Sequence, residues 1–243
     1  MPATGKEGQA SYRRVLLKLS GESLSGGAGF GIDAEVLRRL AVEVGEVIAL
    51  GVQTGIVIGA GNLFRGIRGA ASGFNRITGD HMGMLATIMN SLALRDAFED
   101  AGIPARVLAA REIASVVEPF ERDSAVRHLE DGKAVIFSGG TGNPLFTTDS
   151  AACLRGVEIG AEIIFKATRV DGVYSADPEK DPEAVKYDAL GYDEVIAKQL
   201  RVMDLTAICL ARDHGMPIRV FDMTRPGTLR DNLLGKPNGT LVS

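Results

Sequence analysis

The sequence predicts an α/β protein: a three-layer αβα sandwich on a mainly parallel central sheet. Short β-branched apolar runs alternate with segments of helical apolar spacing along the whole chain. At least five of these predicted strands end in glycine, lysine or hydroxyl residues, as expected where the carboxyl ends of parallel strands meet a ligand. With 243 residues and 45% apolar content, we expect a single domain at 13–243 behind a disordered tail at 1–12.

Composition and charge exclude several classes of protein. The net charge of -4 and the pI of about 5.5 give no electrostatic reason to bind nucleic acid or an anionic membrane. Tryptophan is absent, which argues against a base-stacking surface. Residues 1–11 lack the apolar region of an export signal, and no apolar run is long enough to span a bilayer. We therefore expect a cytoplasmic protein, with Cys153 and Cys209 as buried free thiols.

A glycine-rich stretch from 138 to 156 organises the chain. It follows the predicted strand 134–137 and leads into a helix, and its turn holds Gly139, Gly140, Gly142 and Pro144. Thr147 and Thr148 lie at the helix start, where free N–H groups and the helix dipole favour an anion. Asp149 adds a carboxylate there, so a bound phosphate requires a cation or a fixed donor between them. The alternative is a tight turn with a Thr or Asp N-cap.

Two further strands end in lysine. Lys18 is the penultimate residue of the apolar strand 15–19, and Lys166 lies near the end of the strand 162–168. A lysine in an apolar strand is costly unless its ammonium emerges at the strand end or meets anions. The structural alternative is a lysine that only reaches solvent at the strand end.

A second glycine turn, 59–66, follows the predicted strand 55–58 and carries Arg65, a side chain suited to bridging phosphate oxygens. Neither the dinucleotide-binding fingerprint nor a Walker A motif occurs in the sequence. Phosphoryl transfer requires in-line placement and positive charge around the migrating group. Lys18 and Lys166 are suited to supply that charge from opposite sides, and Asp149 to hold either the lysines or a magnesium ion. These residues indicate phosphoryl transfer or phosphate binding and leave the substrate open.

Helical spacing, glycine and proline predict the remaining elements. We expect helices at 33–50, capped by Asp33, and at 79–100, 121–130, 192–200 and 203–214, strands at 106–108, 218–221 and 241–242, a mobile loop at 26–31, and turns at 169–182 and 225–228. The helix 79–100 is apolar on more than one face, which indicates either a subunit contact or a central core helix. Asp80 either binds a sugar hydroxyl or caps that helix.

Seven motifs resemble the bacterial uridylate kinase branch of the amino acid kinase family. They are Lys-Leu-Ser-Gly-Glu at 18–22, Gly-Ala-Gly-Asn-Leu-Phe-Arg-Gly at 59–66, Gly-Asp-His-Met-Gly-Met at 79–84, Thr-Gly-Asn-Pro at 141–144, Asp-Ser-Ala-Ala at 149–152, Lys-Ala-Thr at 166–168 and Val-Asp-Gly-Val-Tyr at 170–174. The likeness runs in order from about Arg13 to the C-terminus. Three segments are specific to the UMP-using branch: Asn-Leu-Phe-Arg-Gly, Asp-His-Met-Gly-Met and Thr-Gly-Asn-Pro.

The resemblance implies a cytoplasmic homohexamer that phosphorylates UMP to UDP with ATP and Mg²⁺ in pyrimidine nucleotide synthesis. It implies that the catalytic residues are Lys18, Arg65, Asp149 and Lys166. It implies ATP contacts from Lys18, Leu19, Ser20, Gly21, Gly61, Arg65, Thr168, Tyr174 and Asp177. It implies UMP contacts from Ala60, Asp80, Thr141, Gly142, Asn143, Pro144, Leu145, Phe146, Thr147 and Thr148. Ala60 departs from the family, which often has glycine there, and its methyl tightens the pocket if that position needs a positive φ.

Relatives of this kind are often activated by GTP and inhibited by UTP. The corresponding effector positions are Gly26, Gly27, Ala28, Gly29, Phe30, Gly31, Arg95 and Arg106. Glu99 and Asp100 stand where some relatives carry basic residues, which weakens the expectation of GTP control.

Two rival interpretations stay open. A carboxylate or carbamate kinase of the same family would bind a small amino acid derivative in place of UMP, and the Thr-Gly-Asn-Pro loop argues against it. A non-catalytic nucleotide-binding storage or regulatory protein could lose Lys18 or Asp149 without penalty, but both residues are present.

Overall fold

The structure is a computed structural model that describes residues 10–64, 73, 75–178, 180–236 and 238–243. Within them a single large sheet has the strand order β4-β3-β5-β2-β1-β6-β10-β11-β9, and its strands pair in parallel except for β10 with β11. Its strands are β1 (Arg14–Leu19), β2 (Gln53–Ile58), β3 (Ala105–Ala109), β4 (Glu118–Pro119), β5 (Ala134–Ser138), β6 (Ile163–Thr168), β9 (Ala189–Leu190), β10 (Ile218–Asp222) and β11 (Thr240–Val242). A separate antiparallel hairpin pairs β7 (Val173–Tyr174) with β8 (Lys186–Tyr187).

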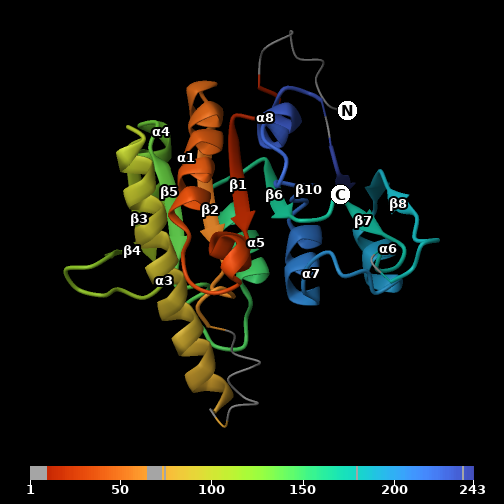
Figure 1. Cartoon of the computed structure of the whole chain (residues 1–243), viewed down its shortest axis with the longest axis horizontal. Helices are drawn as coiled ribbons and strands as arrows, with labels where there is room; N and C mark the ends of the chain where they lie inside the picture. The colour runs from red at the N-terminus through yellow and green to blue at the C-terminus, as the bar shows by residue number, and fades with distance from the viewer. Residues whose placement is uncertain (1–9, 65–72, 74, 179, 237) are drawn as a thin grey trace.

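Helices cover both faces of the sheet (Figure 1). One face carries α1 (Ala34–Ala49), α3 (Arg76–Asp100) and α8 (Thr228–Leu233). The other carries α4 (Arg122–Glu130), α5 (Thr148–Glu158), α6 (Tyr192–Ala197) and α7 (Leu205–Asp213). The predicted three-layer αβα sandwich is confirmed.

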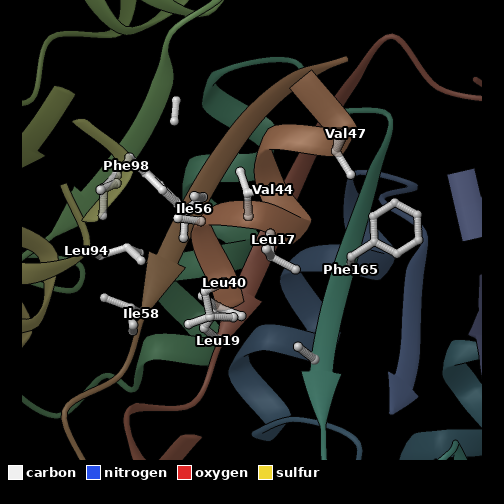
Figure 2. Close-up of a cluster of buried hydrophobic side chains, with 14 of the residues drawn as sticks. Leu17, Leu19, Leu40, Val44, Val47, Ile56, Ile58, Leu94, Phe98 and Phe165 are labelled. Carbon is white, nitrogen blue, oxygen red and sulfur yellow. The ribbon is translucent and has the colours of Figure 1, made fainter. Parts of the chain in front are cut away.

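The strand β1 shows why the sheet is central. Because side chains alternate along a strand, Leu17 and Leu19 enter one core and Leu16 enters the other. Figure 2 shows Leu17 and Leu19 packed in the cluster formed with α1 and α3. A strand buried on both faces reads as a continuous apolar run, which is the pattern of this segment.

Several predicted elements have the expected ends. Asp33 caps α1, and its Oδ1 accepts hydrogen bonds from the backbone N–H groups of Glu35 and Val36. Thr147 caps α5 in the same way. No helix in the described part of the chain is long and apolar enough to cross a membrane.

Other elements differ from the predictions. The 3₁₀ helix η1 (Gly21–Ala28) occupies the start of the loop predicted at 26–31, and α8 begins where only a turn was predicted. The helix α3 starts at Arg76 and is capped by Asn75, so the alternative role of Asp80 as its cap is wrong. Short segments such as η1 and α8 carry too few turns for periodicity to reveal them.

The first described residues pack against the domain. The Ser11 N–H donates to the Leu233 carbonyl, and the Tyr12 ring meets Phe165 edge-on at 6.0 Å between centroids. These two residues fall inside the predicted tail, whose first nine residues lie outside the described ones.

Glu43 makes an unusual contribution to stability. It is only 6% exposed on α1, and neither carboxylate oxygen has a hydrogen-bond partner in the described part of the chain. Burial raises the pKa of Glu43 to about 7, against the opposing charge of Arg39 and with the help of Glu46. Folding therefore favours the protonated form of the Glu43 carboxyl. The stabilisation from this preference is complete at pH values below the pKa of Glu43 in the unfolded chain, and it is lost as the pH rises through about 7, the pKa in the folded chain.

We expect Glu43→Gln to remove this pH dependence. At pH 8 the variant should be more stable than the parent by roughly 1–3 kcal/mol, the usual cost of a buried unsatisfied polar group, and at pH 5 the two should be alike. Urea unfolding at both pH values measures the difference. Glu35→Gln, an exposed change on the same helix, is the control and should behave alike at both pH values. If the free energy of unfolding changed by the same amount between pH 5 and pH 8 in Glu43→Gln and in the parent, Glu43 would not be the source of the pH dependence.

Candidate active site

Two lysines meet at the carboxyl end of the sheet. The strands β1 and β6 are parallel neighbours, and their register places Lys18 directly beside Lys166. Leu16 lies two residues before Lys18, and Ile164 lies two residues before Lys166. Both of these apolar side chains are buried on the face of the sheet that α5 covers. Since side chains two apart share a face, both ammonium groups extend toward the start of α5. Two adjacent cations in a buried setting repel each other unless an anion lies between them.

Asp149 is that anion. Its Oδ1 lies 2.6 Å from Lys18 Nζ and its Oδ2 lies 3.1 Å from Lys166 Nζ. All three side chains are at most 15% exposed. The lysines belong to two strands and the aspartate to the first turn of a helix, so the cluster exists only in the folded sheet. Of the two roles left open for Asp149, the geometry favours holding the lysines.

Burial and charge act against each other in this cluster. Burial alone would raise the pKa of Asp149, but the ammonium groups of Lys166 and Lys18 outweigh it and hold that pKa below its usual value. Burial lowers the pKa of Lys166, with Asp149 opposing and Lys18 adding to the effect. Asp149 is therefore a carboxylate at neutral pH. Two lysines against one carboxylate leave an excess of positive charge, which suits an anionic ligand.

The segment before α7 supports the cluster, and the sequence did not reveal it. Lys166 Nζ donates to the Val202 carbonyl, and Thr147 Oγ1, the cap of α5, donates to the Asp204 carboxylate. Asp204 also accepts from Ser150 Oγ at 3.0 Å and caps α7 through the N–H of Ala207. Asp204 lies at the start of the helix predicted at 203–214, and no motif in the sequence marks it as part of a site.

Two glycine turns pack backbone to backbone beside Lys18. A Cβ on Gly21 would lie 2.5 Å from the carbonyl oxygen of Gly59 and 2.6 Å from the N–H nitrogen of Gly61. The Gly59 N–H donates to the Leu19 carbonyl at 3.0 Å. Ala60 is not among the described residues with positive φ, so its methyl causes no backbone strain. Gly21 is required by this close approach and not by its own conformation.

We expect Gly21→Ala to lower the rate of phosphoryl transfer at this site at least tenfold. The added methyl must push the turn at 59–61 away by several tenths of an ångström, and small misplacements of reacting groups have effects of this size. Gly27→Ala is the matched control, because a Cβ there meets nothing within 4 Å. Steady-state kinetics of the two variants check this. Equal rates for both variants would show that the contact is unimportant.

The third glycine turn has a strained conformation. Gly139, Gly140 and Gly142 all have positive φ, and so does Leu145, at 73°. Positive φ is costly for a leucine and typical of functional loops. The Leu145 N–H is held at 2.8 Å by Asp80 Oδ2, and Asp80 is also paired with Arg76. Asp80 thus fixes this turn, and its carboxylate retains lone pairs for a ligand hydroxyl.

We call the hollow between this turn and α3 the acceptor cavity, with a volume of about 200 Å³. Its lining is Ala60, Arg76, Gly79, Asp80, Gly83, Met84, Thr87, Gly140, Thr141, Asn143, Phe146, Thr147 and Thr148. Of the residues predicted to contact UMP, Gly142, Pro144 and Leu145 do not line it. The sequence prediction did not include five lining residues of α3, although their spacing places them on one side of that helix: Arg76, Gly79, Gly83, Met84 and Thr87.

Two larger cavities adjoin the lysines. One, of about 510 Å³, is lined by Lys18, Leu19 and Ser20, and the other, of about 570 Å³, by Tyr174 and Asp177. Lys166 and Thr168 line both cavities, and we call these two cavities together the donor cavities. Lys198 and Arg201 line the second and were missed, because no motif marks them. Gly21 and Gly61, also predicted to contact ATP, line neither cavity, and Arg65 lies outside the described residues.

The predicted effector residues divide between two places. Arg95 and Arg106 line a separate cavity of about 390 Å³ together with Glu99, Glu112 and Glu118. Gly26 instead lines a donor cavity, and no residue of 26–31 lines the cavity that holds the two arginines. Within one chain the structure does not bring the two sets together.

Cys153, whose pKa is affected by the charges of the cluster, is not a reactive thiol. Burial raises the pKa of Cys153 to about 12, with Asp149 and Asp204 adding to the effect, so this thiol stays protonated. Cys209 lies half-buried on α7, not buried as predicted, and is free as well. No group of three His, Cys, Asp or Glu side chains arranged for a metal ion occurs among the described residues.

Comparisons with known proteins agree on one family. Residues 13–222 match the model of the amino acid kinase family. The chain is 62% identical over 242 residues to a uridylate kinase of Marinobacter nauticus, with all of both chains covered. It is 59% identical to a uridylate kinase of Pseudomonas putida, covering 96% of this chain and 95% of that one. The UMP kinase of Bacillus anthracis superposes with a TM-score of 0.93 at 39% identity, covering 96% of each chain.

Proposed function

The chain belongs to the amino acid kinase family, and we propose that it transfers the terminal phosphoryl group of ATP to UMP, giving ADP and UDP. The observation that carries this proposal is the cluster of Lys18, Asp149 and Lys166: its lysines line the donor cavities, and its aspartate follows Thr148, which lines the acceptor cavity. Relatives named uridylate kinase at about 60% identity over nearly the full length support the choice of UMP.

The lysines supply what the reaction needs most. The migrating phosphoryl group carries negative charge on its equatorial oxygens, and fixed cations in a water-poor site stabilise that charge. Lys18 lines the first donor cavity, and Lys166 lines both donor cavities. The ammonium group of Lys166 is held by Asp149 and the Val202 carbonyl. Because their partners fix both ammonium groups in advance, no reorganisation is needed when charge develops.

The acceptor needs no general base. The second pKa of a phosphate monoester is about 6, so the attacking oxygen of UMP is already anionic at neutral pH. Asp149 is paired with two lysines, and its pKa is held low, which makes it a poor base. We therefore assign Asp149 the role of organising the lysines.

Magnesium fits the site as a companion of the triphosphate. The lysine cluster holds one carboxylate, Asp149, and the described residues form no three-ligand metal cluster of their own. Mg²⁺ in kinases is bound by substrate phosphates and one or two carboxylates, and it keeps several waters. With ATP bound, Asp149 would be available to hold the ion, and the ion would neutralise phosphate charge.

We further propose that the chain is a cytoplasmic homohexamer, as the resemblance implies. We also propose that GTP activates it and that UTP inhibits it. The exposed apolar side chains of Ile77, Leu85 and Met89 on α3 support burial of that helix against another subunit. Light scattering of the purified chain tests assembly, and rates measured with GTP or UTP test regulation.

A coupled assay of ADP release tests the function, with UMP, CMP and glutamate as acceptors. We expect rapid turnover with UMP and little with CMP or glutamate. Equal turnover of UMP and CMP, or a preference for glutamate, would contradict the proposal. No turnover with any acceptor would favour a nucleotide-binding protein without catalysis.

A further inference from the structure

Two buried asparagines form a closed pair beneath the second glycine turn. Asn62, in that turn, is 1% exposed, and Asn90, on α3, is 0% exposed. Asn62 Nδ2 donates to Asn90 Oδ1 at 3.0 Å, and Asn90 Nδ2 donates to Asn62 Oδ1 at 2.8 Å. Burying two amides this deeply is costly unless their hydrogen bonds are satisfied, and this pair satisfies itself on one edge.

The remaining edge of each amide holds backbone. Asn90 Nδ2 also donates to the Gly59 carbonyl, and Asn62 Nδ2 to the Gly31 carbonyl, both at 2.8 Å. The Gly31 N–H donates back to the Asn62 carbonyl at 3.0 Å. All four amide N–H groups of the pair are therefore used. The pair joins α3 to the turn at 59–62 and to the loop before α1.

The backbone held by this pair belongs to the active site. The Gly59 carbonyl is the group that lies against Gly21, and the next residue, Ala60, lines the acceptor cavity. One turn earlier on α3, Thr87 Oγ1 accepts the Gly139 N–H at 2.8 Å and so holds the other glycine turn of the same cavity. Thus α3 fixes the backbone on both sides of the acceptor.

We propose that Asn62 and Asn90 are positioning residues of the phosphoryl transfer: their paired amides set the turn at 59–62 against α3 and thereby set the distance between acceptor and donor. Neither side chain lines the acceptor or donor cavities. The pair acts through the Gly59 carbonyl. This inference rests on the proposed function, since it assigns a role within that reaction.

Asn90→Asp is the sharpest test, because the two side chains have nearly the same shape. The substitution replaces the donor that faces the Gly59 carbonyl and Asn62 Oδ1 with a carboxylate oxygen, which is repelled by the partial negative charge on both oxygens. We expect kcat at pH 8 to fall about tenfold to a hundredfold, because small misplacements of reacting groups have effects of this size. The KM values for ATP and UMP should change much less.

The pH profile separates positioning from general damage. Burial raises the pKa of a carboxyl group, and a protonated carboxyl can again donate to the Gly59 carbonyl. The kcat of Asn90→Asp, relative to the parent, should therefore rise as the pH falls from 8 to 6. Ser91→Ala is the matched control: Ser91 is the next buried polar residue of α3, and its hydroxyl donates only to Thr87 within the same helix. It should keep kcat within twofold at both pH values.

The outcomes separate this inference from the proposed function. If the parent turns over UMP and folded Asn90→Asp does so at a similar rate, the positioning role is wrong and the function stands. If the parent itself does not turn over UMP, the function is wrong. Should Asn90→Asp fail to fold, Asn62→Asp makes the same change from the turn, facing the Gly31 carbonyl. Failure of both variants to fold would reduce the pair to a structural role and overturn the proposal.

Discussion

Lys18→Ala should lower the turnover of UMP phosphorylation at least a hundredfold. Lys18 brings a fixed positive charge to the carboxyl end of β1, between Asp149 and the first donor cavity. Removing a single preorganised stabilising group from an active site typically reduces kcat by about 10²–10³. The loss should appear in kcat and not in KM alone, because the charge matters most when the phosphoryl group is in transit.

Steady-state kinetics of ADP release measure this effect. Lys133→Ala is the control: Lys133 is also ion-paired, with Asp131, but it lies between α4 and β5, away from the cluster. The control should retain normal turnover. A near-normal rate for Lys18→Ala, in protein that is folded and binds ATP, would refute the role of this lysine.

Asp149→Ala should be among the most destabilising single changes in the chain. Removing the carboxylate leaves Lys18 and Lys166 adjacent, buried and uncompensated. Loss of one partner from a buried ion pair costs roughly 3–5 kcal/mol, far more than loss of an exposed pair. Because the folded pKa of Asp149 is lowered, its contribution is present above the unfolded pKa and is lost as the pH falls through the folded pKa.

Urea unfolding at pH 7 checks the second effect. Asp131→Ala removes an aspartate from the exposed pair with Lys133 and should change stability little. At a pH low enough to protonate Asp149 in the parent, the difference between the parent and Asp149→Ala should shrink. A stability loss no larger than that of Asp131→Ala would mean that the cluster does not depend on its carboxylate.

Much of the fold followed from local patterns. The strand β1 and the helix α1 were predictable because their signals are local. The signal for β1 is an apolar run around Lys18, and the signal for α1 is a helical repeat of apolar residues capped by Asp33. The cluster could also be anticipated in outline. Each of its members lies at a strand end or a helix start, and in a parallel sheet those positions meet at one edge.

The supporting contacts were not predictable. The Asn62–Asn90 pair joins residues 28 apart, and Asp204 meets Thr147 across 57 residues. Neither contact leaves a periodic signal, and each polar residue has a sufficient local explanation as a turn or a cap. Which side of α3 lines the acceptor cavity likewise depends on where the turn at 139–147 lies in space. Tertiary packing decides these features, and sequence spacing does not encode them.

A crystal structure with ADP, UMP and a planar fluoride mimic of the migrating phosphoryl group would show whether the two lysines act on that group. We expect the Nζ atoms of Lys18 and Lys166 to lie within hydrogen-bond distance, about 3 Å, of the phosphate oxygens or the mimic, with Asp149 still between them. A mimic bound away from both lysines, or lysines turned toward solvent in that complex, would contradict this role of the lysines.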